Sequence, residues 1–225
     1  MSEPGRARGR PPRTSREQII DKAVELLLAE PLKPLSIHGL ARALGLSPMA
    51  LYHHVGGKDA LLQAVAARLM AELQPQLPEG PWQQQLRAWA VAVRRHFLKY
   101  PVLLGLIGWR AHISSAWLAQ VALLARVLGR AGFADEALAD AVQWTSATLF
   151  SAVYMEIVGR ASGAQLSRAD VDRLPEADAA LMVALLPHLL PKRAGALFDD
   201  HVERVIEALE HRAPASHASR PAIRG

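Results

Sequence analysis

The feature that most constrains the fold is the placement of helix-capping residues in residues 36–58, SIHGLARALGLSPMALYHHVGGK. Ser36 and Ser47 are suited to cap helices, because a serine side chain accepts a backbone N–H from the first turn. Gly45 stands where a helix must end in a left-handed conformation, and Pro48 occupies a first helical position, where its missing N–H costs nothing. The stretch predicts two short helices joined by a tight turn, with a third helix starting at once.

Apolar spacing gives each of the two helices an inner face. Ile37, Leu40, Ala41 and Leu44 share one face of the first helix, and Leu51 and Val55, four residues apart, share one face of the second. The rest of the second helix then points outward. This is the pattern of a helix-turn-helix unit, whose second helix enters the major groove of DNA. On the pattern alone, an ordinary helical hairpin of a bundle is an equal alternative.

The residues themselves favour DNA. The segment LSIHGLARALGLSPMALYHHVGGKDALL resembles the DNA-binding segment of the tetracycline-repressor (TetR) family. The pattern L-Y-x-H-V-x-x-K-x-x-L-L, from Leu51 to Leu62, is especially like that of the repressor for which the family is named. The motif similarity covers about residues 15–65. Beyond these residues the chain resembles the family more weakly, in its length and helical character. The resemblance implies an all-α transcriptional regulator, by default a repressor.

Positions matching the family's motif imply a set of DNA contacts. His38, Met49, Ala50 and Tyr52 match base-reading or groove-facing positions, and Met49 and Ala50 suit apolar contact with thymine methyl groups. Ser36, Tyr52, His53 and Lys58 suit phosphate contact, which fixes register without reading sequence. The adjacent His53 and His54 do not predict a metal site, since neighbouring helical positions diverge by about 100°.

Charge is concentrated at the two ends of the chain. The net charge is +5, of which residues 1–16 contribute +4 and residues 212–225 contribute +3, leaving −2 for the body between them. Arg8 and Arg10, in Arg-Gly-Arg-Pro, resemble the core of minor-groove AT-hook peptides, because a flexible Arg-rich strand fits a narrow A·T groove. The alternative is a disordered basic leader without a role. The tail 212–225 is expected to be disordered.

Composition narrows the class of protein. The 225 residues are 51% hydrophobic and contain no cysteine, which excludes disulfides and thiolate metal sites. The longest strongly apolar run, residues 102–109, is far short of the ~20 residues that span a bilayer. The Arg-rich start lacks an apolar segment typical of a secretory signal. We expect a cytoplasmic protein.

No segment alternates as a strand does, so the predicted fold is all-α. We expect a disordered basic arm (1–14), a helix-turn-helix DNA-binding domain with a linking helix (15–74) and a helical ligand-binding and dimerisation domain (81–211), divided by the Pro-rich stretch 75–81. Helix starts, helix ends and apolar stripes predict helices at the following places: from Ser15 to before Pro31, from about Lys58, Trp82–Lys99, a short one after Pro101, Ser115–Ala131, Asp135–Ala161, Glu176–Leu190 and Arg193–His211. Residues 162–175 are predicted to form a polar loop.

The second half of the chain is rich in aromatic residues. Eleven of the 12 aromatic residues, including all five Trp, follow residue 81. Flat apolar side chains suit the lining of a ligand cavity, although each ring taken alone is better explained as core packing. The family resemblance implies a small-molecule effector here. The expected effector-binding residues are Trp89, Phe97, Trp109, His112, Trp117, Gln143, Trp144, Phe150 and Tyr154, with Met155, Arg110, Thr145 and Glu156 as further candidates.

Metal chelation is not carried over from the family. Counting back from Gly132-Phe133, the position of the metal-binding histidine of the family's namesake falls near Gly108, which cannot be a ligand, and His112 is out of register. We therefore expect a mainly apolar or aromatic effector, with neither a metal nor a cofactor. We expect no enzyme activity: Asp199-Asp200-His201 lies on an amphipathic helix without a supporting cluster, and no P-loop or nucleophile motif is present.

The expected partners are double-stranded operator DNA, the effector and a second copy of the chain. One short recognition helix contacts too few bases to be specific, so such proteins pair. Helix 135–161 and the stripe Val202, Val205, Ile206 and Leu209 resemble the family's dimer helices, although such stripes also pack within a subunit. The alternative to an inducible repressor is a constitutive DNA-binding regulator or architectural protein without an effector.

Overall fold

The computed structural model describes residues 14–30, 33–107, 115–162, 168–189 and 195–213. Within these ranges every regular element is a helix, which confirms the predicted all-α class. The helices are α1 (Arg16–Ala29), α2 (Ile37–Leu44), α3 (Pro48–Val55), α4 (Lys58–Met70), α5 (Trp82–Lys99), α6 (Leu103–Ile107), α7 (Ser115–Arg130), α8 (Asp135–Ser162), α9 (Arg168–Val171), α10 (Glu176–Leu189) and α11 (Ala196–Arg212).

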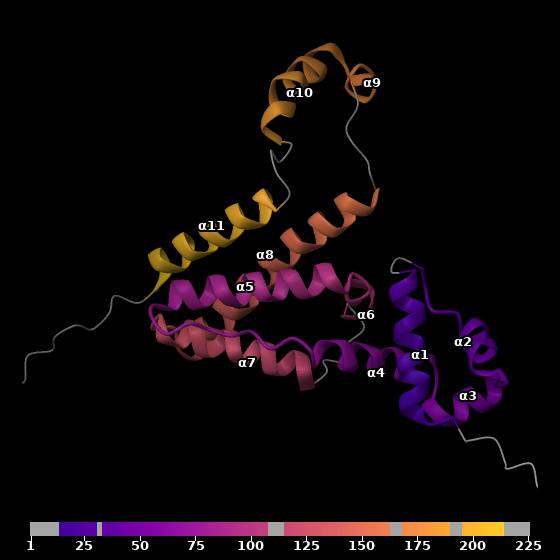
Figure 1. Cartoon of the computed structure of the whole chain (residues 1–225). Coiled ribbons are helices and arrows are strands. Elements are labelled where there is room, and N and C mark those ends of the chain that lie inside the picture. Colours follow the sequence, from indigo (N-terminus) through magenta and orange to yellow (C-terminus); the bar gives the residue numbers. More distant parts are fainter. Residues whose placement is uncertain (1–13, 31–32, 108–114, 163–167, 190–194, 214–225) are drawn as a thin grey trace, which may run out of the picture.

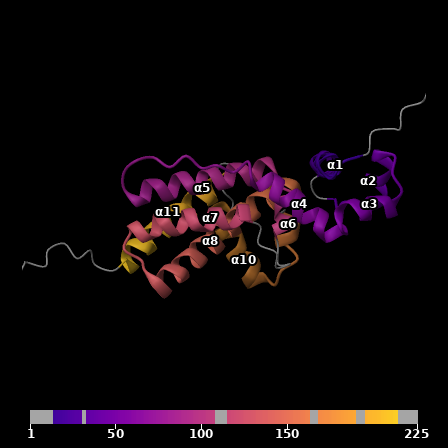
Figure 2. The ribbon, with the colours of Figure 1, turned by 90° about the horizontal axis from the view of Figure 1, so that it is seen from below.

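The molecule is elongated, with α1–α3 at one end and α5, α7, α8 and α11 forming the body (Figure 1). The linking helix α4 packs on α1 and α3 at one end of the molecule and on α6 and α7 of the body. Figure 2 shows α4 and α6 between the two parts. A movement of α6 or α7 would therefore act directly on α4, the helix that is attached to the DNA-binding end.

Local sequence signals set the helix boundaries as predicted. At α1 the Ser15 hydroxyl accepts the Gln18 N–H at 3.2 Å and the Gln18 side chain accepts the Ser15 N–H at 2.8 Å, which is the expected capping box. The core of this end consists of side chains that are at most 3% exposed, from Ile19 and Ala23 of α1, Leu40 of α2, Leu51 of α3 and Leu61 of α4. One compact core therefore fixes all four helices.

Two predictions for the second half need correction. The stretch 162–175 is not wholly a loop, because α9 forms in it, with Val171 buried and Asp170 bonded to Arg173 at 2.9 Å. The helix predicted from Arg193 begins only at Ala196, after Gly195 takes a left-handed φ of 83°. Arg193 lies outside the described residues.

The stripe expected at the dimer interface faces inward instead. Val202, Val205, Ile206 and Leu209 are all at most 4% exposed, because α11 packs on α8 and α5 of the same chain. One set of exposed apolar side chains lies on α8, α10 and the start of α11: Tyr154, Met155, Val158, Leu181, Val183, Leu185 and Leu197. Any contact between copies of the chain would thus use other faces of these helices.

Candidate nucleic-acid interface

The turn between α2 and α3 is built from the residues that predicted it. The Ser36 hydroxyl accepts the Gly39 N–H at 3.1 Å and begins α2. Gly45 ends the helix with a left-handed φ of 66°, and its N–H and that of Leu46 bond back to the carbonyls of Arg42 and Ala41. The chain reverses within three residues, so α3 is held at a fixed angle to α2.

Helix α3 is anchored on one side and open on the other. The Ser47 hydroxyl accepts the Ala50 N–H at 3.1 Å, and Pro48 takes the first turn as expected. Leu51 is 0% exposed, whereas its neighbour Met49 is 68% exposed and Tyr52 is 40% exposed. Two large side chains on an eight-residue helix are thus left largely or partly in water, beside one that is fully buried. This asymmetry is what a groove-reading helix requires.

The other predicted DNA contacts lie at the start of α2, on α3 and at the start of α4. His38 is exposed at the start of α2, and His53 is exposed on α3, while Ala50 is half-buried. Gly56 and Gly57, both with positive φ, turn the chain directly into α4, so Lys58 lies exposed at the first position of α4. The Ser36 hydroxyl is used as a cap but retains its own proton for donation to a phosphate. Arg8 and Arg10 lie outside the described residues.

The surface of this unit is not strongly basic. Residues 15–74 contain six Lys and Arg and six Asp and Glu. These charges balance, so residues 15–74 carry no broad basic face.

The predicted effector residues fall into separate places. Trp89 and Phe97 of α5 are buried in the helical domain, and the ring of Phe150 meets that of Phe97 edge-on at 5.4 Å. Trp117 and Gln143 line an open groove between α7 and α8. The Trp144 ring is half-buried, 5.8 Å from the guanidinium of Arg212. Trp109, Arg110 and His112 lie outside the described residues.

Two further predicted residues belong elsewhere. Tyr154 does not join the buried rings but lines a cavity between the domains. Glu156 is held in a bidentate bond by Arg94, at 2.6 and 2.7 Å, and at 2.6 Å by Arg160, so its carboxylate is already occupied. Arg94 holds the pKa of this carboxyl below its usual value, with burial opposing the effect.

Two of the candidate effector residues carry unpartnered polar atoms inside the helical domain. The Trp89 Nε1 and Thr145 Oγ1 atoms are buried without a hydrogen-bond partner among the described residues. A buried group left in this way carries a desolvation cost of about 1–3 kcal/mol. The sequence named both residues as candidates, but it could not predict that these atoms lack partners, since burial of a single polar atom leaves no pattern.

Hydrogen bonds to the two residues Glu72 and Leu73, which follow α4, connect the linking helix to the body. The buried Gln120 side chain of α7 donates to the Leu73 carbonyl at 2.8 Å. Glu72 accepts from the Tyr100 hydroxyl and from Lys99 of α5, and these bonds lower its pKa, Tyr100 having the larger effect. Burial lowers the pKa of the neighbouring His96. The segment directly after the linking helix is thus bonded to α5 and α7.

A left-handed Gly turn between two short helices, with one face of the second helix exposed, is the geometry of the helix-turn-helix class of DNA-binding domains. Comparisons with known families agree with this geometry. Residues 19–65 match the model of bacterial regulatory proteins of the tetR family, and residues 74–210 match the tetracyclin repressor-like C-terminal domain. The chain belongs to the tetR family of bacterial regulatory proteins.

Individual relatives agree over different lengths. The tetracycline repressor protein class D of Escherichia coli is 40% identical over 91 residues, which cover 39% of this chain and 42% of that protein, less than half its length. The HTH-type transcriptional repressor DrrR1 of Streptomyces coeruleorubidus is 25% identical over 91% of this chain and 80% of its own length. The solved structure of the Streptomyces coelicolor TetR family protein ActR in complex with actinorhodin has a TM-score of 0.73 at 23% identity, covering 89% of this chain and 99% of that chain. This last likeness shows the shared fold.

Among the described residues, no helix is both long and apolar enough to cross a membrane. The same ranges hold no group of three or more His, Cys, Asp or Glu side chains arranged to bind a metal ion.

Proposed function

We propose that this protein is a homodimeric transcriptional repressor that binds operator DNA through α3 and is released by a small, largely apolar effector. The observation that carries the DNA-binding part is the asymmetry of α3, in which Leu51 is fully buried while Met49 and Tyr52 are exposed. The family membership and the repressor DrrR1, similar over nearly the whole chain, support the regulatory part.

The proposed contacts divide by role. Met49 and Ala50 touch base edges in the major groove, where thymine methyl groups offer apolar contact, and Tyr52 and His38 lie beside them. Ser36, His53 and Lys58, together with the Tyr52 hydroxyl, bind phosphates. Arg8 and Arg10 enter the adjacent minor groove. Removal of residues 1–13 is then expected to lower DNA affinity and to flatten its dependence on salt.

Pairing of two chains supplies the specificity that one eight-residue helix lacks. The exposed apolar side chains of α8 and α10, including Met155, Leu181 and Leu185, support an interface between copies. Two recognition helices at groove spacing require half-sites about one helical turn of DNA apart.

The proposed effector site is the aromatic interior of the helical domain around Trp89, Phe97 and Phe150. The unpartnered Trp89 Nε1 and Thr145 Oγ1 atoms support it, because they offer hydrogen bonds to a polar group on an otherwise apolar ligand. ActR, a neighbour with this fold, has been solved in complex with actinorhodin, which supports a ligand site in a protein of this fold. Effector binding shifts α6 and α7 against α4 and moves the recognition helices out of register. Because coupling is reciprocal, operator DNA weakens effector binding by the same factor.

Selection of bound fragments from a genomic DNA pool tests the DNA-binding proposal. The expected result is a two-fold symmetric site with half-sites about one turn apart. Absence of any enriched sequence would refute sequence-specific binding.

The five Trp residues report on the effector. A cognate ligand from a cell extract should both change Trp fluorescence and release the selected DNA. Failure of a broad extract to do either would favour a constitutive regulator.

A further inference from the structure

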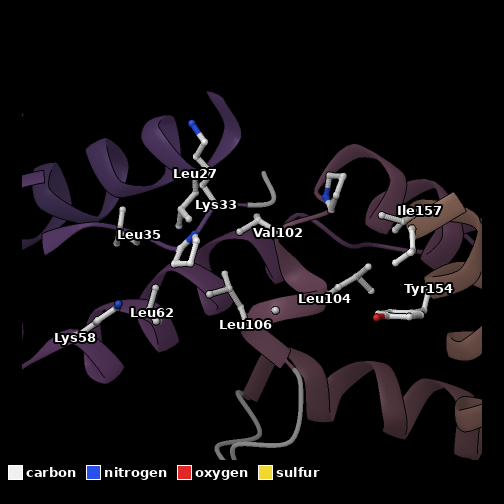
Figure 3. Close-up of a pocket in the computed structure, with 14 residues that line it drawn as sticks. Leu27, Lys33, Leu35, Lys58, Leu62, Val102, Leu104, Leu106, Tyr154 and Ile157 are labelled. Carbon is white, nitrogen blue, oxygen red and sulfur yellow. The ribbon is translucent and has the colours of Figure 1, made fainter. Parts of the chain in front are cut away.

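A cavity of about 380 Å³ lies between the DNA-binding end and the helical domain (Figure 3). Leu27, Leu35 and Leu62 line it from the DNA-binding end and the linking helix, and Leu104, Leu106 and Ile157 line it from α6 and α8. Its volume falls in the range of about 300–1,000 Å³ typical of small-molecule sites. Trp89, Phe97 and Phe150, the core of the proposed effector site, are not among its lining residues.

The charged groups of this cavity have one sign. Lys33 and Lys58 line it, and among its described lining residues there is no carboxylate. Figure 3 shows the Lys58 ammonium and the Tyr154 hydroxyl pointing into the cavity from opposite sides. Lys33 is bonded to Glu30 at 2.5 Å, and both side chains are exposed, so this pair contributes little and is easily exchanged. An apolar cavity bordered by cations favours an apolar ligand with a negative group.

We propose that this cavity is a second ligand site, for an apolar organic anion. The apolar body of the ligand packs between Leu62, Leu106 and Ile157, and its anionic group binds the Lys58 ammonium. The Tyr154 hydroxyl donates a hydrogen bond from the opposite wall.

A ligand here acts on DNA binding in two ways. It contacts both domains at once, so its affinity depends on how they are placed relative to each other, and it favours one placement. It also engages Lys58, the residue proposed to bind a DNA phosphate, so ligand and operator compete for the same ammonium group. This second consequence rests on the proposed function, whereas the binding of the anion does not.

A substitution that fills the cavity tests the site. The anionic dye 1-anilinonaphthalene-8-sulfonate is titrated into the full chain without DNA, and its binding is followed by fluorescence. Gly105 lines the cavity, and a Cβ added there meets no atom within 4 Å. Gly105→Phe should weaken dye binding about tenfold or more. The matched control is Gly129→Phe, on α7 outside the cavity, where an added Cβ also meets nothing within 4 Å. It should bind the dye like the unaltered chain. Equal dye affinity in the two variants would overturn the proposal.

The charge requirement is tested by a neutral twin of the dye, N-phenyl-1-naphthylamine, which lacks the sulfonate. Lys58 is exposed, so Lys58→Met should leave the fold intact. The variant should weaken binding of the anionic dye about fivefold to tenfold and leave the neutral dye unaffected. An equal effect on both dyes, or on neither, would contradict an anion site at Lys58. These titrations contain no DNA, so their failure is distinct from failure of the DNA selection.

Discussion

The DNA-binding end and the helical domain bury different kinds of side chain. Among the described residues the buried polar side chains are Gln85, His96, Gln120 and Thr145, and all four lie in the helical domain. Up to Met70 the buried side chains are apolar, and α2 and α3 each begin at a serine cap and end at a left-handed glycine. The comparison indicates that the DNA-binding end is a rigid unit. The helical domain attached to it retains costly buried polar groups, as proteins do at functional sites.

Truncation of a buried side chain in the DNA-binding end should cause the largest loss of stability. Leu51 is fully buried at the centre of this core, so Leu51→Ala should lower the free energy of unfolding by about 3 kcal/mol through lost burial and a cavity. Chemical denaturation measures this change. Leu28→Ala, at an exposed position of α1, is the control and should change stability by at most about 0.5 kcal/mol. Equal losses would mean that the unit lacks a single tightly packed core.

In the helical domain the most sensitive backbone position should be Gly195. Its φ is 83°, and an added Cβ would lie 2.2 Å from an Arg94 guanidinium nitrogen. Arg94 cannot move freely, because it is bonded to Glu156 and lies over the Phe198 ring. Gly195→Ala should cost about 2.5 kcal/mol from backbone strain and the disturbed Arg94 bonds. Thermal unfolding of Gly129→Ala, a helical position with open space, should show the opposite sign, a gain of up to about 1 kcal/mol.

The Arg94–Glu156 pair should give the helical domain a pH dependence. The pKa of Glu156 lies below its usual 4.5, so its contribution to stability is present above that pH and is lost as pH falls through the lowered pKa. Glu156→Gln should lower stability by about 2 kcal/mol near neutral pH, and the difference should shrink in acid. The exposed Arg87–Glu203 pair is the control, and denaturation of Glu203→Gln should show a loss of at most about 0.5 kcal/mol. A pH-independent difference for Glu156→Gln would contradict this account.

The smallest loss of stability should come from removal of a helix cap. Ser47→Ala removes the bond to the Ala50 N–H and should cost about 1 kcal/mol, whereas Ser47→Asn keeps a capping oxygen and should cost much less. Denaturation curves of the two variants test whether local caps fix α3. Identical curves would show that tertiary packing alone sets its start.

Sequence patterns predicted the local features of the fold, and packing decided the rest. The caps at Ser36 and Ser47 and the left-handed Gly45 are encoded within four residues, so they could be read directly. The Arg94–Glu156 bond joins positions 62 residues apart, and no local pattern announces it. Tyr154 was grouped with the buried rings because it is aromatic. Its neighbour Val153 on α8 faces the core of the domain instead, and the Tyr154 side chain is left exposed. The cavity between the domains depends on the same long-range packing.

The most direct test of the account compares DNA affinities of the unaltered chain and a Met49→Ala, Tyr52→Ala double variant at one salt concentration. The unaltered chain should bind its selected site at least about 10³-fold more tightly than unrelated DNA. The double variant should lose about tenfold to a hundredfold on the selected site while its unfolding free energy stays unchanged, because both side chains are exposed. Undiminished binding of the selected site by the double variant would contradict the central claim that the exposed face of α3 reads DNA.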